Sequence, residues 1–307
     1  MSLFRERPDL FHPKHWPMWA GIGFLRLITL LPWKAQRVLG GYIGRFAFLF
    51  LTERRRVVRI NLGLCFPELQ KRERMQLAKR HYEAVGIGAF ETCMAWWARP
   101  ERIPEYQFVG LEILEKFQKE GRGVILFTAH FTTLEICGRM FSDTMPMGGL
   151  YRDPDNPVVA WLMHRGRIDK MSVAVPMDDL RGLIRGLKKG HTIWYAPDQS
   201  KKGKKGAFTS VLPFFGVPAR TNTAMSRIAK MSGAAVVPFF AQRLEDGGYR
   251  LEIFPELEDF PSDDEDQDAI RANHLIEENI RKVPEQYFWI HRRFKKRGED
   301  LPDVYKK

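Results

Sequence analysis

Cysteine is scarce in this chain of 307 residues. Its three cysteines, Cys65, Cys93 and Cys137, lie far apart, and their odd number excludes a fully paired disulfide framework. None of them has the paired spacing of a structural zinc site. The sequence therefore predicts buried, free cysteines and no metal, in a main domain that faces the reducing cytoplasm.

Signatures of nucleic-acid recognition are also lacking. The chain has no paired-cysteine zinc pattern, no basic heptad helix and no aromatic RNA-binding motif. Its net charge of +12 must then serve another anionic partner, such as a phospholipid surface, a phosphorylated glycolipid or an acidic protein. Charge alone does not choose among these three.

Long apolar runs are few, and the run nearest the N-terminus is borderline for a membrane span. It reads WPMWAGIGFLRLITLLPW from Trp16 to Trp33, with Arg26 as its only charge. The run is slightly short of the roughly 20 residues of a spanning helix, although its terminal tryptophans suit a membrane interface. A membrane helix, either transmembrane or lying on the bilayer, and an amphipathic core helix are both compatible with this pattern.

The residues around this run set its expected orientation. Charges of both signs precede it and no small-x-small cleavage site follows it, which excludes a signal peptide. Basic residues recur from Lys34 and cluster at 54–59, so the positive-inside rule places the rest of the chain on the cytoplasmic side. We predict a membrane-anchoring region over 1–60 and a catalytic domain over 61–307.

Beyond the first hundred residues, short apolar runs alternate with helical patterns. The runs at 123–129, 174–176 and 191–197 are separated by segments with helical spacing, which is typical of an α/β layered sheet. The runs at 234–240 and 248–255 are joined by a short acidic and glycine-rich turn, which predicts an antiparallel hairpin. The predicted fold is therefore α/β, with a mixed sheet flanked by helices.

The segment ILFTAHFTTLEICGR carries the candidate chemistry. An apolar strand leads into His130, and Glu135 follows five residues later in a new helix. Within one continuous helix these side chains would diverge by about 140°, so we expect His130 on the loop before the helix. His130 would then remove a hydroxyl proton while Glu135 fixes the tautomer of its ring. Taken alone, the spacing also fits a structural histidine.

No serine in a G-x-S-x-G turn is present, which favours direct attack of an acceptor hydroxyl on an activated acyl group. Several other motifs accompany the histidine. They are HPKHW, NLGLCFPE, GLYRDPDNP, APDQ, LPFFGVPARTNTA and PEQYFWIHRRFK. Together with H-x-x-x-x-E they resemble the lysophospholipid and lipid A acyltransferase family over nearly the whole chain, and within it the Kdo-dependent lauroyl-type enzymes.

The resemblance implies a glycerol-3-phosphate acyltransferase-like fold and His130 with Glu135 as the catalytic pair. It implies transfer of a lauroyl or similar chain from acyl carrier protein to a hydroxyl of a phosphorylated, Kdo-bearing lipid A precursor. No cofactor is expected, and the location would be the bacterial inner membrane. A myristoyl or palmitoleoyl donor and another glycolipid or glycerolipid acceptor are the neighbouring alternatives. A basic membrane-surface protein without chemistry is the alternative from another class.

Further site positions of the family fall on Arg167 and on Asp198, with Gln199 beside it. Arg167 would clamp a phosphate or the sugar acid, and Asp198 would orient Arg167 or hydrogen-bond a sugar hydroxyl, unless the two residues form a structural ion pair. Arg152 and the lysines between 201 and 205 are candidates for contacts with an anionic headgroup or the carrier protein.

Three features qualify these assignments. Asp153 and the SKKGKKG loop depart from the family pattern, so headgroup and acyl specificity are not carried over. Trp289, His291 and the arginines beside them are predicted to pack against the body without acting in catalysis.

Overall fold

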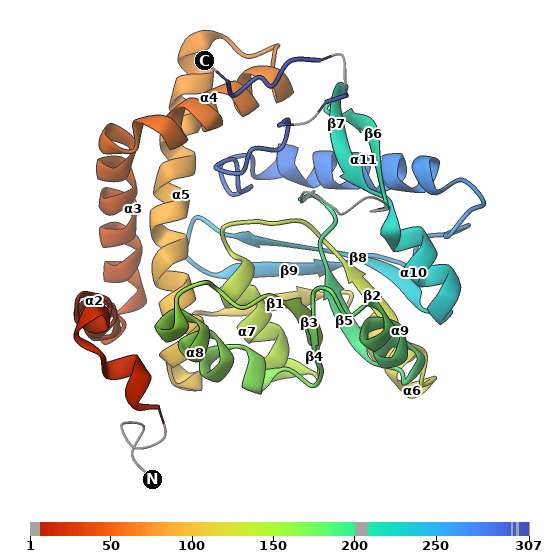
Figure 1. Cartoon of the computed structure of the whole chain (residues 1–307), viewed down its shortest axis with the longest axis horizontal. Helices are drawn as coiled ribbons and strands as arrows, with labels where there is room; N and C mark the ends of the chain where they lie inside the picture. Colours follow the sequence, from red (N-terminus) through yellow and green to blue (C-terminus); the bar gives the residue numbers. More distant parts are fainter. Residues whose placement is uncertain (1–6, 200–207, 296, 299–300, 307) are drawn as a thin grey trace.

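The computed structural model describes residues 7–199, 208–295, 297–298 and 301–306. Its centre is a seven-stranded sheet with strand order β1-β9-β8-β2-β5-β3-β4 (Figure 1). The strands are β1 (Tyr106–Val109), β2 (Val124–Phe127), β3 (Gly148–Tyr151), β4 (Ala174–Pro176), β5 (Thr192–Tyr195), β8 (Ala235–Arg243) and β9 (Tyr249–Ile253). Neighbouring strands are parallel except for β8 and β9, which form the predicted antiparallel hairpin. The predicted mixed α/β sheet is confirmed.

Helices cover both faces of this sheet, and strand β2 shows why. All four of its residues are buried, as expected for a central parallel strand that packs on two sides. Ile125 and Phe127 belong to one apolar core, whereas Val124 and Leu126 belong to another. The first core includes side chains of α9 (Leu180–Lys188), α10 (Ala224–Ser232) and α11 (Glu265–Lys282). The second includes side chains of α6 (Leu111–Lys119) and α7 (Leu134–Thr144).

The other elements surround this body. A two-stranded antiparallel sheet packs near α11, and short 3-10 turns mark several connections. The small sheet consists of β6 (Thr209–Phe214) and β7 (Val217–Asn222), and a further helix is α8 (Pro157–Gly166). The 3-10 turns are η1 (Pro8–Phe11), η2 (Pro13–His15), η3 (Pro100–Arg102) and η4 (Ile168–Lys170).

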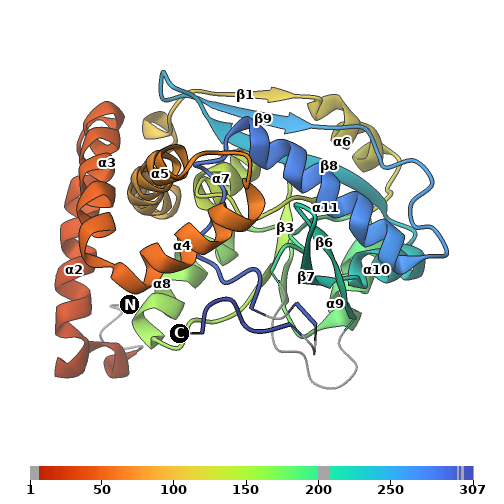
Figure 2. The same ribbon diagram turned by 90° about the horizontal axis from the view of Figure 1, so that it is seen from above.

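In the described part of the chain four α-helices precede the sheet, and they stand mainly on one side of it (Figures 1 and 2). They are α2 (Trp16–Ile28), α3 (Trp33–Phe50), α4 (Thr52–Cys65) and α5 (Lys71–Trp97). Glycines let α3 lie directly on α5, since a Cβ at Gly44 would come within 2.0 Å of the Tyr82 carbonyl oxygen. The predicted boundary between residues 60 and 61 falls inside α4.

The N-terminal run forms α2 and the turn after it. Among the described residues, no helix combines the length and the apolar character that a membrane crossing needs. The expectation of a transmembrane helix therefore has no support here.

Candidate active site

His130 and Asp198 meet at one edge of the sheet. His130 follows β2 and precedes α7, so it lies on the loop where the sequence places it. Asp198 follows β5, which pairs in parallel with β2. Because neighbouring parallel strands end at the same edge, the two side chains are brought together from residues 68 positions apart.

A buried carboxylate orients the His130 ring. Nδ1 of His130 lies 2.6 Å from Oδ1 of Asp198, and the backbone N–H of His130 donates to Oδ2 at 3.1 Å. The hydroxyl of Tyr287 also donates to Oδ2, at 3.1 Å. Asp198 is only 1% exposed, which leaves its position determined by these three donors. The orienting group is thus Asp198, and the prediction of that role for Glu135 was wrong.

The local electrostatics keep Asp198 charged. Burial opposes the charge, but the His130 ring and its hydrogen bonds hold the pKa of Asp198 below its usual value. Burial and the nearby Asp198 raise the pKa of Tyr287 well above its usual range, so its hydroxyl keeps the proton that it donates. His291 lies in the same environment, and burial lowers its pKa to about 4. Its ring is therefore neutral near neutral pH.

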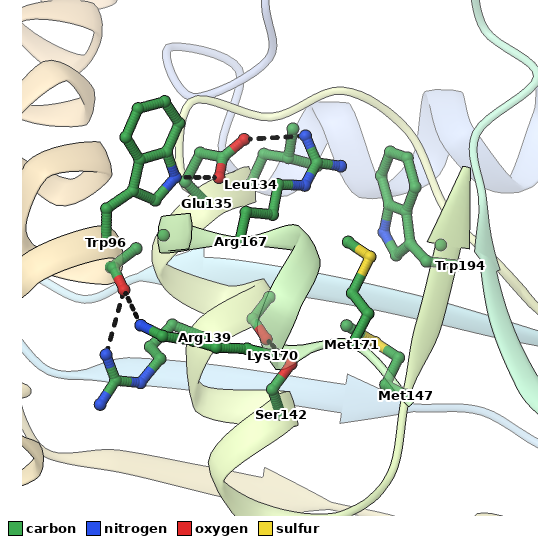
Figure 3. A pocket seen from close by; sticks show the side chains of 14 residues that line it. Trp96, Leu134, Glu135, Arg139, Ser142, Met147, Arg167, Lys170, Met171 and Trp194 are labelled. Atoms are coloured by element: carbon green, nitrogen blue, oxygen red, sulfur yellow. Dashed lines mark hydrogen bonds and ion pairs between the residues drawn. The ribbon is translucent and has the colours of Figure 1, made fainter. Parts of the chain in front are cut away.

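Glu135 belongs to a second polar cluster, on the first turn of α7. Its carboxylate accepts from Nε1 of Trp96 at 2.9 Å and from the guanidinium of Arg167 at 3.2 Å (Figure 3). The ion pair that the sequence allowed between Arg167 and Asp198 is therefore absent, and Glu135 is the partner of Arg167. The helical turn after residue 133 points Glu135 toward α5 and the end of α8. It therefore points away from Asp198, which follows β5.

Two hollows adjoin these clusters. The first is lined by Trp96, Glu135 and Arg167 on one side and by Lys170, Met171 and Trp194 on the others (Figure 3). The second lies beside the residues that flank His130. Its wall is mainly apolar, with Phe131, Phe141, Met147 and Phe239. The hollows share a wall, made by Leu134, Gly138, Met147 and Trp194.

The C-terminal segment holds the loop of His130 in place. The Thr132 amide donates to the Gln286 carbonyl at 2.8 Å, and the Phe288 amide donates to the His130 carbonyl at 3.0 Å. Trp289 is fully buried, so the predicted packing of this segment is confirmed. Its contribution of Tyr287 to the site was missed. The only hint in the sequence is that a buried tyrosine hydroxyl needs a partner.

The other predicted site residues lie nearby without a described contact to His130. Arg152 is exposed just after β3, and Gln199 is half-buried next to Asp198. The lysines between 201 and 205 fall outside the described residues. The three cysteines are free and buried, as predicted. In the described part of the chain, no group of three or more metal-ligating side chains could hold an ion.

A histidine oriented by a buried carboxylate beside apolar hollows is suited to activating a hydroxyl group for attack on an acyl donor. Over residues 4–296 the chain matches the family described as bacterial lipid A biosynthesis acyltransferase. It is 40% identical to the lipid A biosynthesis lauroyltransferase of Escherichia coli K12, over 96% of this chain and 97% of that protein. It is 39% identical to the palmitoleoyltransferase of the same organism, over 97% of each chain.

The chain belongs to the bacterial lipid A biosynthesis acyltransferase family. It is an acyltransferase that acts in lipid A biosynthesis, which confirms the predicted family and reaction class. The crystal structure of the 1-acyl-sn-glycerophosphate acyltransferase PlsC from Thermotoga maritima covers 79% of this chain and 97% of its own. The two chains share 16% identity, with a TM-score of 0.39.

Proposed function

We propose that the protein transfers a fatty acyl chain from acyl carrier protein to a hydroxyl of a phosphorylated, Kdo-bearing lipid A precursor. The observation that carries the proposal is the His130–Asp198 pair beside the two hollows. The carboxylate on Nδ1 keeps a proton there and leaves Nε2 as the base. The reaction would take place at the cytoplasmic face of the bacterial inner membrane.

The chemistry proceeds without a covalent enzyme intermediate. Nε2 of His130 takes the proton of the acceptor hydroxyl as its oxygen attacks the thioester carbonyl carbon. The tetrahedral intermediate then loses the thiolate, which recovers the proton from the imidazolium. The products are an ester and the thiol of the carrier.

Backbone amides of the catalytic turn would stabilise the oxyanion. Asp198 and Gln286 occupy the amides of His130 and Thr132, respectively. The amides of Phe131 and Thr133 are the candidates that follow from this arrangement. Arg167, which Glu135 holds beside the first hollow, would bind a phosphate or the sugar acid of the acceptor.

The direct test is mass spectrometry of the lipid after incubation with acyl carrier protein thioesters. The acceptors would be the phosphorylated disaccharide with Kdo, the same lipid without Kdo, and a lysoglycerophospholipid. A new ester on the Kdo-bearing acceptor alone supports the proposal, and preference for the glycerolipid would replace it with the neighbouring alternative. Lipid binding without any ester in wild-type protein would favour the non-enzymatic alternative.

Replacing Glu135 with alanine should reduce transfer by about 10²-fold, the loss that a misplaced substrate-positioning group can cause. The reason is that Arg167 loses the carboxylate that holds its guanidinium. The measurement is the rate of ester formation with saturating donor. Glu256→Ala is a matched control, since it breaks the Arg122–Glu256 pair just before β2 at the opposite end of the strands. Unchanged transfer by the Glu135 variant would exclude this role.

An apolar face on α2 and α3 is the proposed attachment to the membrane. Phe24, Leu27, Phe46 and Phe50 are 62% to 66% exposed, and other large apolar side chains lie between them. No aspartate or glutamate occurs between residues 10 and 52, whereas Arg26, Lys34, Arg37 and Arg45 do. An exposed apolar face with only positive charges fits an anionic bilayer surface, with the helices lying in its plane.

Vesicle binding tests this attachment. The double substitution Phe46→Glu and Phe50→Glu should weaken binding to phosphatidylglycerol vesicles at least tenfold, since burying one such side chain contributes about 1.5–3 kcal/mol. Co-sedimentation measures the effect. Met231→Glu is the control, because Met231 is also an exposed apolar residue, at 51%, but lies on α10 and not on α2 or α3. Equal vesicle binding by the double variant and the wild type would refute the attachment.

A further inference from the structure

Gly138 occupies an unusual position in α7. It is in the middle of the helix and lines both hollows beside the active site. A Cβ built on it would meet no heavy atom of another part of the chain within 4 Å. The glycine therefore faces open space on the side where the two hollows adjoin.

Close packing does not explain this glycine. Gly44 and Gly86 lie at a helix crossing where a Cβ would come within 2.0 Å and 2.1 Å of backbone atoms, and Gly138 has no such neighbour. Its backbone is helical, so no left-handed conformation demands glycine. Glycine is a poorer helix former than alanine. Gly138 therefore weakens α7, and no close packing contact requires a glycine there.

The surroundings indicate what the space accepts. The second hollow lies against Thr128, Ala129 and Phe131, which flank the catalytic histidine, and its deeper wall includes Phe141 and Phe239. These side chains offer apolar contacts and few hydrogen-bonding groups. A linear hydrocarbon chain extending from a carbonyl near His130 matches this chemistry.

We infer that the space left open by Gly138, where the two hollows adjoin, forms the far end of the path for the donor acyl chain, and that position 138 selects the chain length. The inference rests on the proposed acyl transfer and adds the residue that determines its specificity. A larger side chain at 138 closes the path, so that long donors lose methylene contacts while short donors keep theirs. One methylene in an apolar pocket changes discrimination by about tenfold or more.

The experiment compares Gly138→Ala and Gly138→Leu with the wild type on saturated acyl carrier protein thioesters of increasing length. The readout is the ratio of kcat/KM for long to short donors. We expect this ratio to fall by at least about tenfold in Gly138→Leu. Gly138→Ala should show an intermediate shift, and its fold is safeguarded because alanine has room and favours the helix.

Gly63→Ala and Gly63→Leu are the matched controls. Gly63 is also inside a helix, α4, with nothing within 4 Å of its added Cβ, and it lines neither of the two hollows. Both controls should keep the wild-type ratio. A Gly138→Leu enzyme with a ratio within about twofold of the wild type would overturn the inference. If that enzyme is inactive, an unchanged ratio in Gly138→Ala would overturn it as well.

Failure here is distinguishable from failure of the proposed function. If wild-type protein forms the ester and the length profile ignores position 138, only the inference about Gly138 fails. If wild-type protein forms no ester with any donor, the proposed acyl transfer itself fails.

Discussion

Asp198→Asn is expected to lower kcat for acyl transfer by a factor on the order of 10³–10⁴, the loss that a comparable change causes in serine-protease triads. Asp198 accepts hydrogen bonds from the His130 ring, the His130 amide and the Tyr287 hydroxyl. An asparagine has only one oxygen. If that oxygen accepts from the two donors on Oδ2, the His130 amide and the Tyr287 hydroxyl, its NH₂ group faces Nδ1 of the His130 ring. The ring would then hold its proton on Nε2, where it cannot act as a base.

The measurement is the rate of ester formation at saturating donor and acceptor, with circular dichroism as the test of folding. Asp268→Asn is the control, because Asp268 is also fully buried but lies on α11, where it accepts from the Ser262 amide at 2.9 Å. That variant should lose stability without a comparable loss of kcat. If kcat of the Asp198→Asn enzyme is within tenfold of the wild-type kcat, Asp198 is excluded as the group that orients His130.

The lowered pKa of Asp198 adds a dependence of stability on pH. A carboxylate whose folded pKa is below its unfolded value stabilises the fold above the unfolded pKa, which is about 3.9. This contribution is lost as the pH falls from there through the folded pKa. The stability difference between wild type and Asp198→Asn should accordingly shrink below about pH 4 and stay constant near neutral pH.

Glu91→Ala is expected to lower the free energy of unfolding by about 3–5 kcal/mol, the usual cost of removing one partner from a buried ion pair. Glu91 is completely buried and accepts from Arg243 at 2.6 Å and 2.7 Å. The hydroxyl of Tyr249 donates to the same carboxylate. Burial opposes the charge on Arg243, but Glu91 raises its pKa, so alanine at 91 would leave a buried cation unpaired.

This network is also connected to the turn that carries His130, through Gln286. The Arg243 amide donates to the Gln286 side chain at 2.8 Å, and that side chain donates back to the Arg243 carbonyl at 2.9 Å. The backbone carbonyl of Gln286 in turn accepts from the Thr132 amide in the turn that carries His130. Loss of Glu91 should therefore loosen the turn that carries His130 as well as the contact of α5 with the sheet.

Denaturant unfolding followed by tryptophan fluorescence measures the effect of Glu91→Ala. Glu83→Ala is the control on the same helix, since its Arg45 partner is largely exposed and the pair should matter little. If both variants unfold at the same denaturant concentration as the wild type, the buried pair does not hold α5 to the sheet.

Several features follow from the sequence because they depend on local patterns. The apolar run before His130 predicts a buried strand, and the start of a helix pattern after it places the histidine on the intervening loop. The β8–β9 hairpin is predictable because its turn is short and its strands are apolar. The apolar character of the N-terminal segment is also visible in the sequence, whereas its exposure and the glycine contact of α3 with α5 are not.

The sequence by itself determined that this protein has an α/β sheet, a strand-end histidine, a basic surface and a family-specific set of motifs. Only the tertiary structure decided that Asp198 orients His130 while Glu135 holds Arg167. The separation of only five residues between His130 and Glu135 had suggested Glu135 as the partner of the His130 ring. The parallel pairing of β2 with β5 brings Asp198 to His130, and the antiparallel contact at Phe131 and Tyr287 adds a hydroxyl from the far end of the chain. Partners of this kind depend on which strands and segments become neighbours, and that choice is made by the packing of the whole core.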